Sequence, residues 1–160
     1  MEQTLFLAMA NQYKDMIFRI ALNYFRSPHD AEDAVQEVLL KLYTSGKPFE
    51  SEQHIRNWLI RVTVNYCKNA LRRPFRHRDV AYEAWAESVS FEHEGESDLF
   101  QAVMALPEAA RTVVYLFYYE ELSVRAIANL LKLSESNVTT RLSRARKQLK
   151  LTLTEEFDDE

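Results

Sequence analysis

Glycine is almost absent from this sequence, which contains only Gly46 and Gly95 among its 160 residues. Tight turns between strands often need glycine, because it adopts a positive φ without steric cost. So little glycine argues against an all-β fold, and the many leucine, alanine, glutamate, arginine and lysine residues favour helices. Hydrophobic residues make up 47% of the chain, which is enough for a buried core and argues against global disorder.

Cysteine and long hydrophobic runs are also scarce. The single cysteine, Cys67, cannot form an intramolecular disulfide, which is consistent with a reducing compartment. The first residues lack a basic segment and a cleavage site, so we expect no signal peptide. No apolar run reaches the ~18 residues that suggest a membrane span. We therefore expect a cytoplasmic protein that does not insert into a membrane.

Patterns that indicate catalysis or metal binding are missing as well. His54, His77 and His93 do not have metal-ligand spacing, and Cys67 has no cysteine partner. The sequence contains no glycine-rich phosphate loop and no nucleophile motif. We expect neither an enzyme nor a bound metal or cofactor.

Charge is unevenly distributed, although the net charge is only −4. Residues 56–78 and residues 139–150 each carry several arginines and lysines and no acidic residue. Acidic residues gather instead over 83–98 and in the last six positions. A local positive field matters more for binding a polyanion than the charge summed over the chain. Two acid-free basic segments in one small acidic protein therefore favour a nucleic-acid ligand over merely solvated helix faces.

Apolar residues at helical spacing predict three helices in the first half of the chain. In chain order, these helices are expected to cover about 2–25, 28–43 and 52–73. Ser27 suits the N-cap of the second helix and Pro28 its first position, whereas Pro74 limits the third helix. We expect the three helices to form a domain over residues 1–79.

An acidic segment and a second helical domain are expected to follow. The apolar pattern fades over residues 80–97, which predicts a flexible linker. Helical patterns resume over 98–151, with Pro107 at a helix start. The remaining residues, 152–160, are expected to form a disordered acidic tail. The predicted fold class is all-α, with two small helical domains.

The segment 122–150 has the most specific local pattern in the sequence. Ser123 suits the N-cap of a short helix, and Ser134 suits the N-cap of a longer one that follows a tight turn. This is a helix-turn-helix pattern, whose second helix enters the major groove of DNA. An amphipathic helix on an unrelated bundle would explain the apolar spacing, but not the caps, the turn and the basic face together.

The second helix of this motif separates an apolar stripe from a polar face. Short polar side chains can reach base edges, and arginine can pair with guanine. The predicted DNA-reading residues are Ser136, Asn137, Thr139, Thr140, Ser143, Arg144 and Lys147. We expect Arg146 and Lys150, together with Lys147, to lie near phosphates.

Two parts of the chain resemble the extracytoplasmic-function (ECF) sigma factors of bacterial RNA polymerase. The resemblance to the second conserved region of this family lies in the runs DAEDAVQEVLLKLY and IRNWLIRVTVNYCKNALRR. The resemblance to the fourth conserved region lies in residues 105–150. Two independent motifs in the expected order make the resemblance specific. It implies that the first domain docks on core polymerase and opens the minus-ten promoter element, and that the second domain reads the minus-thirty-five element.

The resemblance also implies roles for individual residues of the first domain. Those implied to bind the β′ coiled coil of core polymerase are Asp30, Asp33, Gln36 and Glu37. Those implied to capture an unstacked minus-ten base and to follow the separated strand are Arg61, Asn65, Tyr66, Lys68, Asn69, Arg72 and Arg73. Relatives have a base-capturing loop here, so we expect the helix to break near Asn65. Trp58 lies on the apolar face and is interpreted as a core residue.

Two positions depart from the family pattern. Lys132 occupies the turn of the helix-turn-helix, where relatives often carry glycine, although other residues adopt positive φ at modest cost. Thr139 stands where lysine or arginine is common, which leaves the promoter preference open. As partners, the resemblance implies core RNA polymerase including its β subunit, double- and single-stranded promoter DNA, and an anti-sigma factor.

Two other functions compete with this interpretation. A stand-alone DNA-binding regulator would bind duplex DNA by itself, usually as a dimer on paired half-sites. An adaptor that mimics a sigma factor to titrate its antagonist would keep the polymerase-like surfaces but lose the DNA-reading residues. The two basic segments argue against the adaptor.

Overall fold

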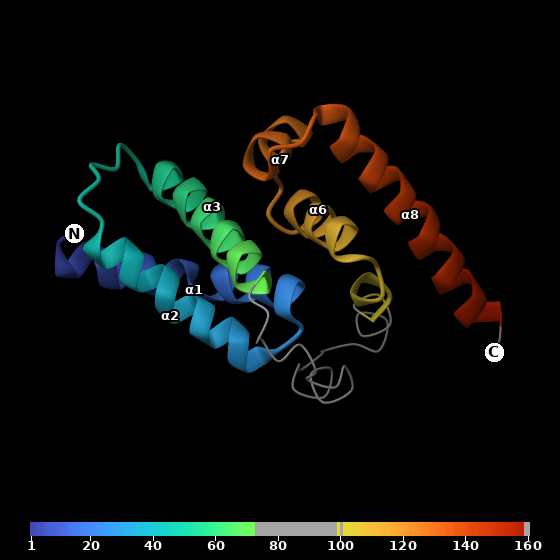
Figure 1. Cartoon of the computed structure of the whole chain (residues 1–160), viewed down its shortest axis with the longest axis horizontal. Helices are drawn as coiled ribbons and strands as arrows, with labels where there is room; N and C mark the ends of the chain where they lie inside the picture. Colours follow the sequence, from blue (N-terminus) through green and yellow to red (C-terminus); the bar gives the residue numbers. More distant parts are fainter. Residues whose placement is uncertain (73–98, 100, 159–160) are drawn as a thin grey trace. The chain divides into compact units, whose positions relative to one another are not determined.

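The computed structural model describes residues 1–72, 99 and 101–158, with side chains up to Thr154, and these residues contain helices and no strand (Figure 1). The predicted all-α class with two small helical domains is confirmed. The chain divides into two compact units, Met1–Trp85 and Ala86–Glu160, each of which is described by itself. The expected linker at 80–97 and the predicted site residue Arg73 lie outside the described residues.

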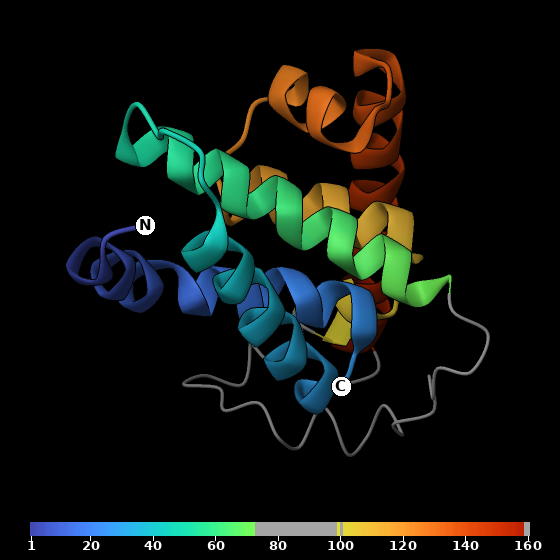
Figure 2. The same ribbon diagram turned by 60° about the vertical axis from the view of Figure 1, so that its left-hand side comes forward.

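The described part of the first unit, residues 1–72, contains three helices that all pack against one another. They are α1 (Gln3–Phe25), α2 (Pro28–Thr44) and α3 (Glu52–Leu71). Figures 1 and 2 show α1 and α2 running alongside each other, with α3 packed against them. The fully buried side chains of this unit include Ile17, Ile20, Val38, Leu42, Leu59, Ile60 and Val64. Burial of each such side chain stabilises the unit by about 1.5–3 kcal/mol.

Capping residues determine where these helices begin and end. The Ser27 hydroxyl accepts a hydrogen bond from the Asp30 N–H at 3.2 Å, and Pro28 occupies the first turn of α2. The Ser51 hydroxyl likewise accepts one from the His54 N–H at 3.1 Å at the start of α3. Arg26 ends α1 in the left-handed region, with φ 54°. Each cap satisfies a backbone group that has no partner inside its helix.

The helix α3 is continuous, so the expected break near Asn65 is wrong. On either side of Asn65, Val64 and Cys67 are completely buried and hold the helix against the core. The buried hydroxyl of Thr63 donates to the Leu59 carbonyl at 2.6 Å, which satisfies it without disturbing the backbone ladder. Neither glycine nor proline occurs in α3, so nothing in the sequence interrupts its hydrogen bonds.

The second unit contains a short helical stretch at 101–104, followed by α6 (Glu108–Tyr118), α7 (Val124–Leu131) and α8 (Glu135–Asp158). Pro107 immediately precedes α6. The Arg111 side chain is only 3% exposed, and it donates to the carbonyls of Met104 and Leu106 at 3.3 and 3.1 Å. These bonds tie α6 to the chain that precedes it.

The C-terminal part of α8 extends further than expected. The disorder expected from residue 152 is not found up to Asp158, because the structure continues the helix to that residue. Extending an existing helix requires no new nucleation, and leucine and glutamate are good helix formers. The net acidity of this segment therefore did not indicate where the helix ends.

Candidate functional site

The turn between α7 and α8 orients the helix that was predicted to read DNA. Lys132 adopts φ 58° and ψ 46°, and its N–H donates to the Ala128 carbonyl. The Leu133 N–H donates to the same carbonyl at 2.9 Å. The Ser134 hydroxyl then accepts from the Asn137 N–H at 3.0 Å and caps α8. Lys132 thus takes the left-handed conformation for which glycine is the usual residue, so the departure at this position leaves the turn intact.

The buried and exposed faces of α8 are clearly separated. Val138, Leu142 and Ala145 are at most 2% exposed, and α8 packs against α6 and α7. All seven predicted DNA-reading residues of α8 are exposed. Five of them recur at intervals of three or four residues, which places them together on the side opposite the buried stripe. These five are Ser136, Thr140, Ser143, Arg144 and Lys147.

The other two predicted residues of α8 lie beside this cluster and hydrogen-bond within the helix. The Asn137 side-chain oxygen accepts from Arg141 Nε at 2.8 Å. The Thr139 hydroxyl donates to the Glu135 carbonyl at 3.0 Å. Base contacts by either side chain would require these bonds to be exchanged. The cluster of five is therefore better suited to contact bases than Asn137 and Thr139 are.

Arg146 is turned toward α6 rather than extended toward a phosphate. Its Nε donates to the Tyr118 hydroxyl at 2.6 Å. Its guanidinium also lies over the rings of Phe117 and Tyr118, at 5.7 and 5.6 Å from their centroids. The geometry indicates a positioning residue that fixes α8 on α6, a role that the sequence analysis missed because the partners are 28 residues apart.

A second polar and basic face lies along α3. Arg61, Asn65, Asn69 and Arg72 are exposed, and Lys68 is half-buried. Their spacing of three and four residues places all five on one side of the helix. A face that alternates amides with cations can contact both base edges and phosphates of a nucleic-acid strand.

Tyr66 is not part of this α3 face. Its ring makes an edge-to-face contact with Phe25 at 6.4 Å, and Lys41 Nζ lies 5.6 Å from its centroid. Trp58, interpreted from the sequence as a core residue, is only half-buried. It lies seven residues before Asn65, hence on the polar face, and contacts Phe49 at 5.5 Å. The seven-residue spacing from Asn65 could have indicated from the sequence that Trp58 lies on this polar face and not in the core.

The outer face of α2 carries the residues predicted to dock on a partner. Asp33, Gln36 and Glu37 are exposed, whereas Asp30 is half-buried in the first turn. Leu40 lies on the same side and is 55% exposed, so an apolar side chain stands among the acidic and amide groups. Sequence reasoning missed Leu40, although its spacing from Asp33, Gln36 and Glu37 could have indicated it. A protein interface commonly combines such a central apolar residue with a polar surround.

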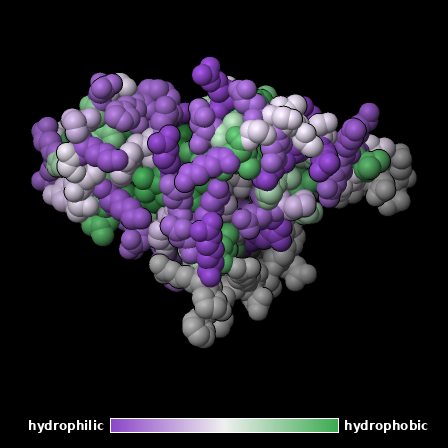
Figure 3. All heavy atoms as spheres, turned by 45° about the horizontal axis from the view of Figure 1, so that its top comes forward, coloured by the Kyte–Doolittle hydropathy of each residue, from purple (hydrophilic) through white to green (hydrophobic). Residues whose placement is uncertain are grey.

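Within the described residues, no group of three or more histidine, cysteine, aspartate or glutamate side chains is arranged to hold a metal ion. None of the helices in this part of the chain is both long and apolar enough to span a membrane. Figure 3 shows hydrophilic side chains over most of the visible surface, with smaller hydrophobic patches between them.

Comparison with known proteins connects both helical units to characterised sequence families. Residues 9–78 match Sigma-70 region 2, and residues 97–149 match Sigma-70 region 4. The RNA polymerase sigma factor SigV of Bacillus subtilis is 27% identical over 156 residues, which cover 96% of this chain and 94% of that protein. The ECF RNA polymerase sigma factor SigW of the same organism is 26% identical over 166 residues, with coverage of 93% and 89%.

A solved structure supports the fold. The structure is that of the sigma factor RpoE of Bartonella quintana, crystallised with the anti-sigma factor NepR. The match covers 89% of this chain and 92% of the RpoE chain. The TM-score is 0.68 and the sequence identity is 21%. This likeness concerns the helical fold alone.

Proposed function

The chain belongs to the sigma-70 family as a sigma factor of the ECF type. We propose that separate described surfaces of the chain bind the two promoter elements and core RNA polymerase. As a sigma factor it directs RNA polymerase to specific promoters for transcription initiation. One observation supports the assignment of a different promoter element to each family region. Each region has an exposed polar and basic helix face opposite a buried stripe. A stand-alone regulator would need only the second of these regions.

The α8 face is assigned to the minus-thirty-five element as a duplex. Short hydroxyl side chains such as Thr140 and Ser143 lie beside Arg144, and all three are exposed. A helix fits the major groove of duplex DNA, where arginine pairs bidentately with guanine. Lys147, one turn further along, is assigned to a phosphate.

The α3 face is assigned to the minus-ten element as a separated strand. Asn65 and Asn69 offer amides to the edges of unstacked bases, while Arg61 and Arg72 lie on the same side for the backbone. Arg73 is assigned to the same strand from the family resemblance. Tyr66 contacts Phe25 here, so stacking on a base would require its ring to leave that contact.

The outer face of α2 is assigned to core RNA polymerase. Asp33, Gln36 and Glu37 provide acidic and amide groups for a basic helix such as the β′ coiled coil, with Asp30 at the margin. The sigma subunit contributes binding energy and strand separation, and the polymerase supplies the catalysis. We place this activity in the cytoplasm, and we assign an anti-sigma factor as the regulatory partner.

The functional boundaries follow the same division. We propose a polymerase-docking and minus-ten domain over residues 1–79 and a minus-thirty-five domain over 98–151. Residues 80–97, which are rich in acidic side chains, are proposed to connect the two domains. The family matches at 9–78 and 97–149 support this division without fixing its ends.

Run-off transcription on genomic fragments tests this function. Purified core polymerase with the chain is expected to initiate at defined promoters, whereas the chain or the core enzyme alone is not. Arg144→Ala is expected to weaken promoter binding by about 1–3 kcal/mol, with the loss greatest at one base pair. Asn65→Ala is expected to impair opening of the promoter more than duplex binding. Failure of the chain to bind core polymerase would contradict the proposed function.

A further inference from the structure

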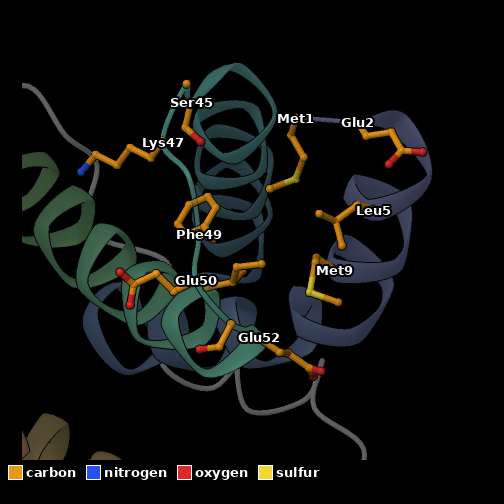
Figure 4. A pocket seen from close by; sticks show the side chains of 12 residues that line it. Met1, Glu2, Leu5, Met9, Ser45, Lys47, Phe49, Glu50 and Glu52 are labelled. Carbon is orange, nitrogen blue, oxygen red and sulfur yellow. The ribbon is translucent and has the colours of Figure 1, made fainter.

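An open pocket of about 440 Å³ lies where the first turns of α1 face the segment between α2 and α3 (Figure 4). Its apolar lining includes Leu5 and Met9 from α1, Phe49 from the connecting segment and Ile55 from α3. Figure 4 shows Leu5 and Met9 pointing from α1 toward the pocket. Met9 and Ile55 are buried at its base, but Leu5 remains 42% exposed at the mouth.

The pocket exists because the end of the three-helix core is not filled. The helix α2 ends at Thr44, and α3 does not begin until Glu52. Gly46 lines the pocket and has no side chain to fill it, and a Cβ added there would meet no atom within 4 Å. Covering exposed apolar surface gains about 25 cal/mol per Å², so a concave apolar site of this kind favours binding of an apolar side chain.

Acidic residues outnumber cationic groups in the lining of this pocket. Glu2, Glu50 and Glu52 contribute three acidic residues from different parts of the unit, against two cationic groups, Lys47 and the Met1 ammonium group. Within the described residues, none of these carboxylates forms an ion pair. Glu52 is held in place, because its side chain accepts a hydrogen bond from the Tyr13 hydroxyl at 3.0 Å. A lining that is acidic on balance disfavours nucleic-acid phosphates and favours a basic protein segment.

The pocket is connected to the outer face of α2 through Tyr43. The Met1 ammonium group, which belongs to a pocket-lining residue, donates to the Tyr43 carbonyl at 3.3 Å. The ring of Phe6 contacts the Tyr43 ring edge-to-face at 5.0 Å. Tyr43 is 45% exposed and lies three residues after Leu40. Acidic groups and exposed apolar side chains therefore extend from α2 to the pocket.

We propose that this pocket seats an apolar side chain of the core RNA polymerase segment that docks on α2. The inference rests on the proposed function and adds the start of α1 and residues 45–52 to the docking surface. The partner segment carries basic residues beside one leucine, methionine or aromatic side chain. Interface hot spots are commonly side chains that are anchored in well-packed, desolvated pockets and surrounded by contacts that exclude water.

Two substitutions test the pocket by different means. Leu5→Asp places a charge at its mouth, and Gly46→Leu adds a side chain where the structure leaves room. Leu7→Asp is the matched control, because Leu7 is 52% exposed on the same helix but does not line the pocket. The measurement is the equilibrium affinity of each full-length chain for purified core polymerase, after circular dichroism has shown equal helix content.

We expect Leu5→Asp and Gly46→Leu to weaken binding about 10-fold or more, and Leu7→Asp to stay within about twofold. If the unsubstituted chain binds core polymerase and both pocket variants bind equally well, the pocket inference is overturned while the proposed function stands. The inference is also overturned if Leu7→Asp weakens binding as much as Leu5→Asp. If the unsubstituted chain does not bind core polymerase, the proposed function itself fails.

Discussion

Replacing Arg146 with alanine is expected to loosen the attachment of α8 without removing a phosphate contact. Arg146 Nε donates to the Tyr118 hydroxyl at 2.6 Å, and the guanidinium lies over the rings of Phe117 and Tyr118. A hydrogen bond contributes about 0.5–1.5 kcal/mol net, and an exposed cation–π contact about 0.5–1 kcal/mol. Because Arg146 is exposed, we expect the free energy of unfolding to fall by about 1 kcal/mol, the lower end of the combined range.

Lys147→Ala provides the comparison, because Lys147 is the next residue and lies on the exposed polar face of α8. Each phosphate contact contributes about 0.9 to the slope of log affinity against log salt concentration. Loss of one contact is therefore expected to reduce the affinity change between about 50 and 200 mM salt by a factor of about 3–4. The same substitution is expected to leave the free energy of unfolding nearly unchanged.

Two assays separate these effects. Urea unfolding followed by circular dichroism measures stability, and promoter-fragment binding by the reconstituted holoenzyme over a series of salt concentrations measures the slope. We expect Arg146→Ala to change stability and Lys147→Ala to change the slope. The reasoning is refuted if Arg146→Ala lowers the salt slope as much as Lys147→Ala does and leaves unfolding unaffected.

Three further predictions concern stability. Lys132→Gly is expected to raise the free energy of unfolding by about 0.5–1 kcal/mol, because the residue has φ 58°; a lower urea midpoint would contradict this. Leu59→Ala is expected to cost about 2–5 kcal/mol in the same assay, because Leu59 is completely buried, and a loss below about 1 kcal/mol would mean that the site collapses around the smaller side chain. Burial and the hydrogen bond to Glu52 raise the pKa of Tyr13 above 10.0, so its stabilising contribution is complete below that pH and is lost as the pH rises through the folded-state pKa. Tyr13→Phe is expected to make alkaline unfolding less dependent on pH, and an unchanged profile would argue against this contribution.

Helix boundaries and the helix-turn-helix were predictable because short-range chemistry determines them. Ser27, Ser123 and Ser134 each accept a hydrogen bond from an N–H three residues ahead, as their positions before apolar periodic segments predict. The polar face of α8 was predictable for the same reason, since helical periodicity assigns residues to faces without knowledge of the partner helices.

Features that depend on tertiary contacts or on other family members were harder to predict. The contact between Arg146 and Tyr118 joins two helices and leaves no periodic signal. The break in α3 was predicted from the resemblance to the ECF family. In this chain α3 is continuous, and the buried Val64 and Cys67 hold it against the core. The pocket beside Leu5 arises from missing packing at the end of a bundle, which no local pattern encodes.

Opposite charges on neighbouring helices of the first unit would allow one small domain to select the two different partners proposed for it. The outer face of α2 carries Asp33 and Glu37, whereas the polar face of α3 carries Arg61 and Arg72, and α2 and α3 are in contact. Packed helices lie about 8–10 Å apart, which is close to the Debye length at physiological salt. Each face therefore keeps most of its own field. The acidic face of α2 disfavours DNA, and the basic face of α3 disfavours a basic protein segment. The net charge of −4 sums the two faces and therefore does not show that they favour different partners.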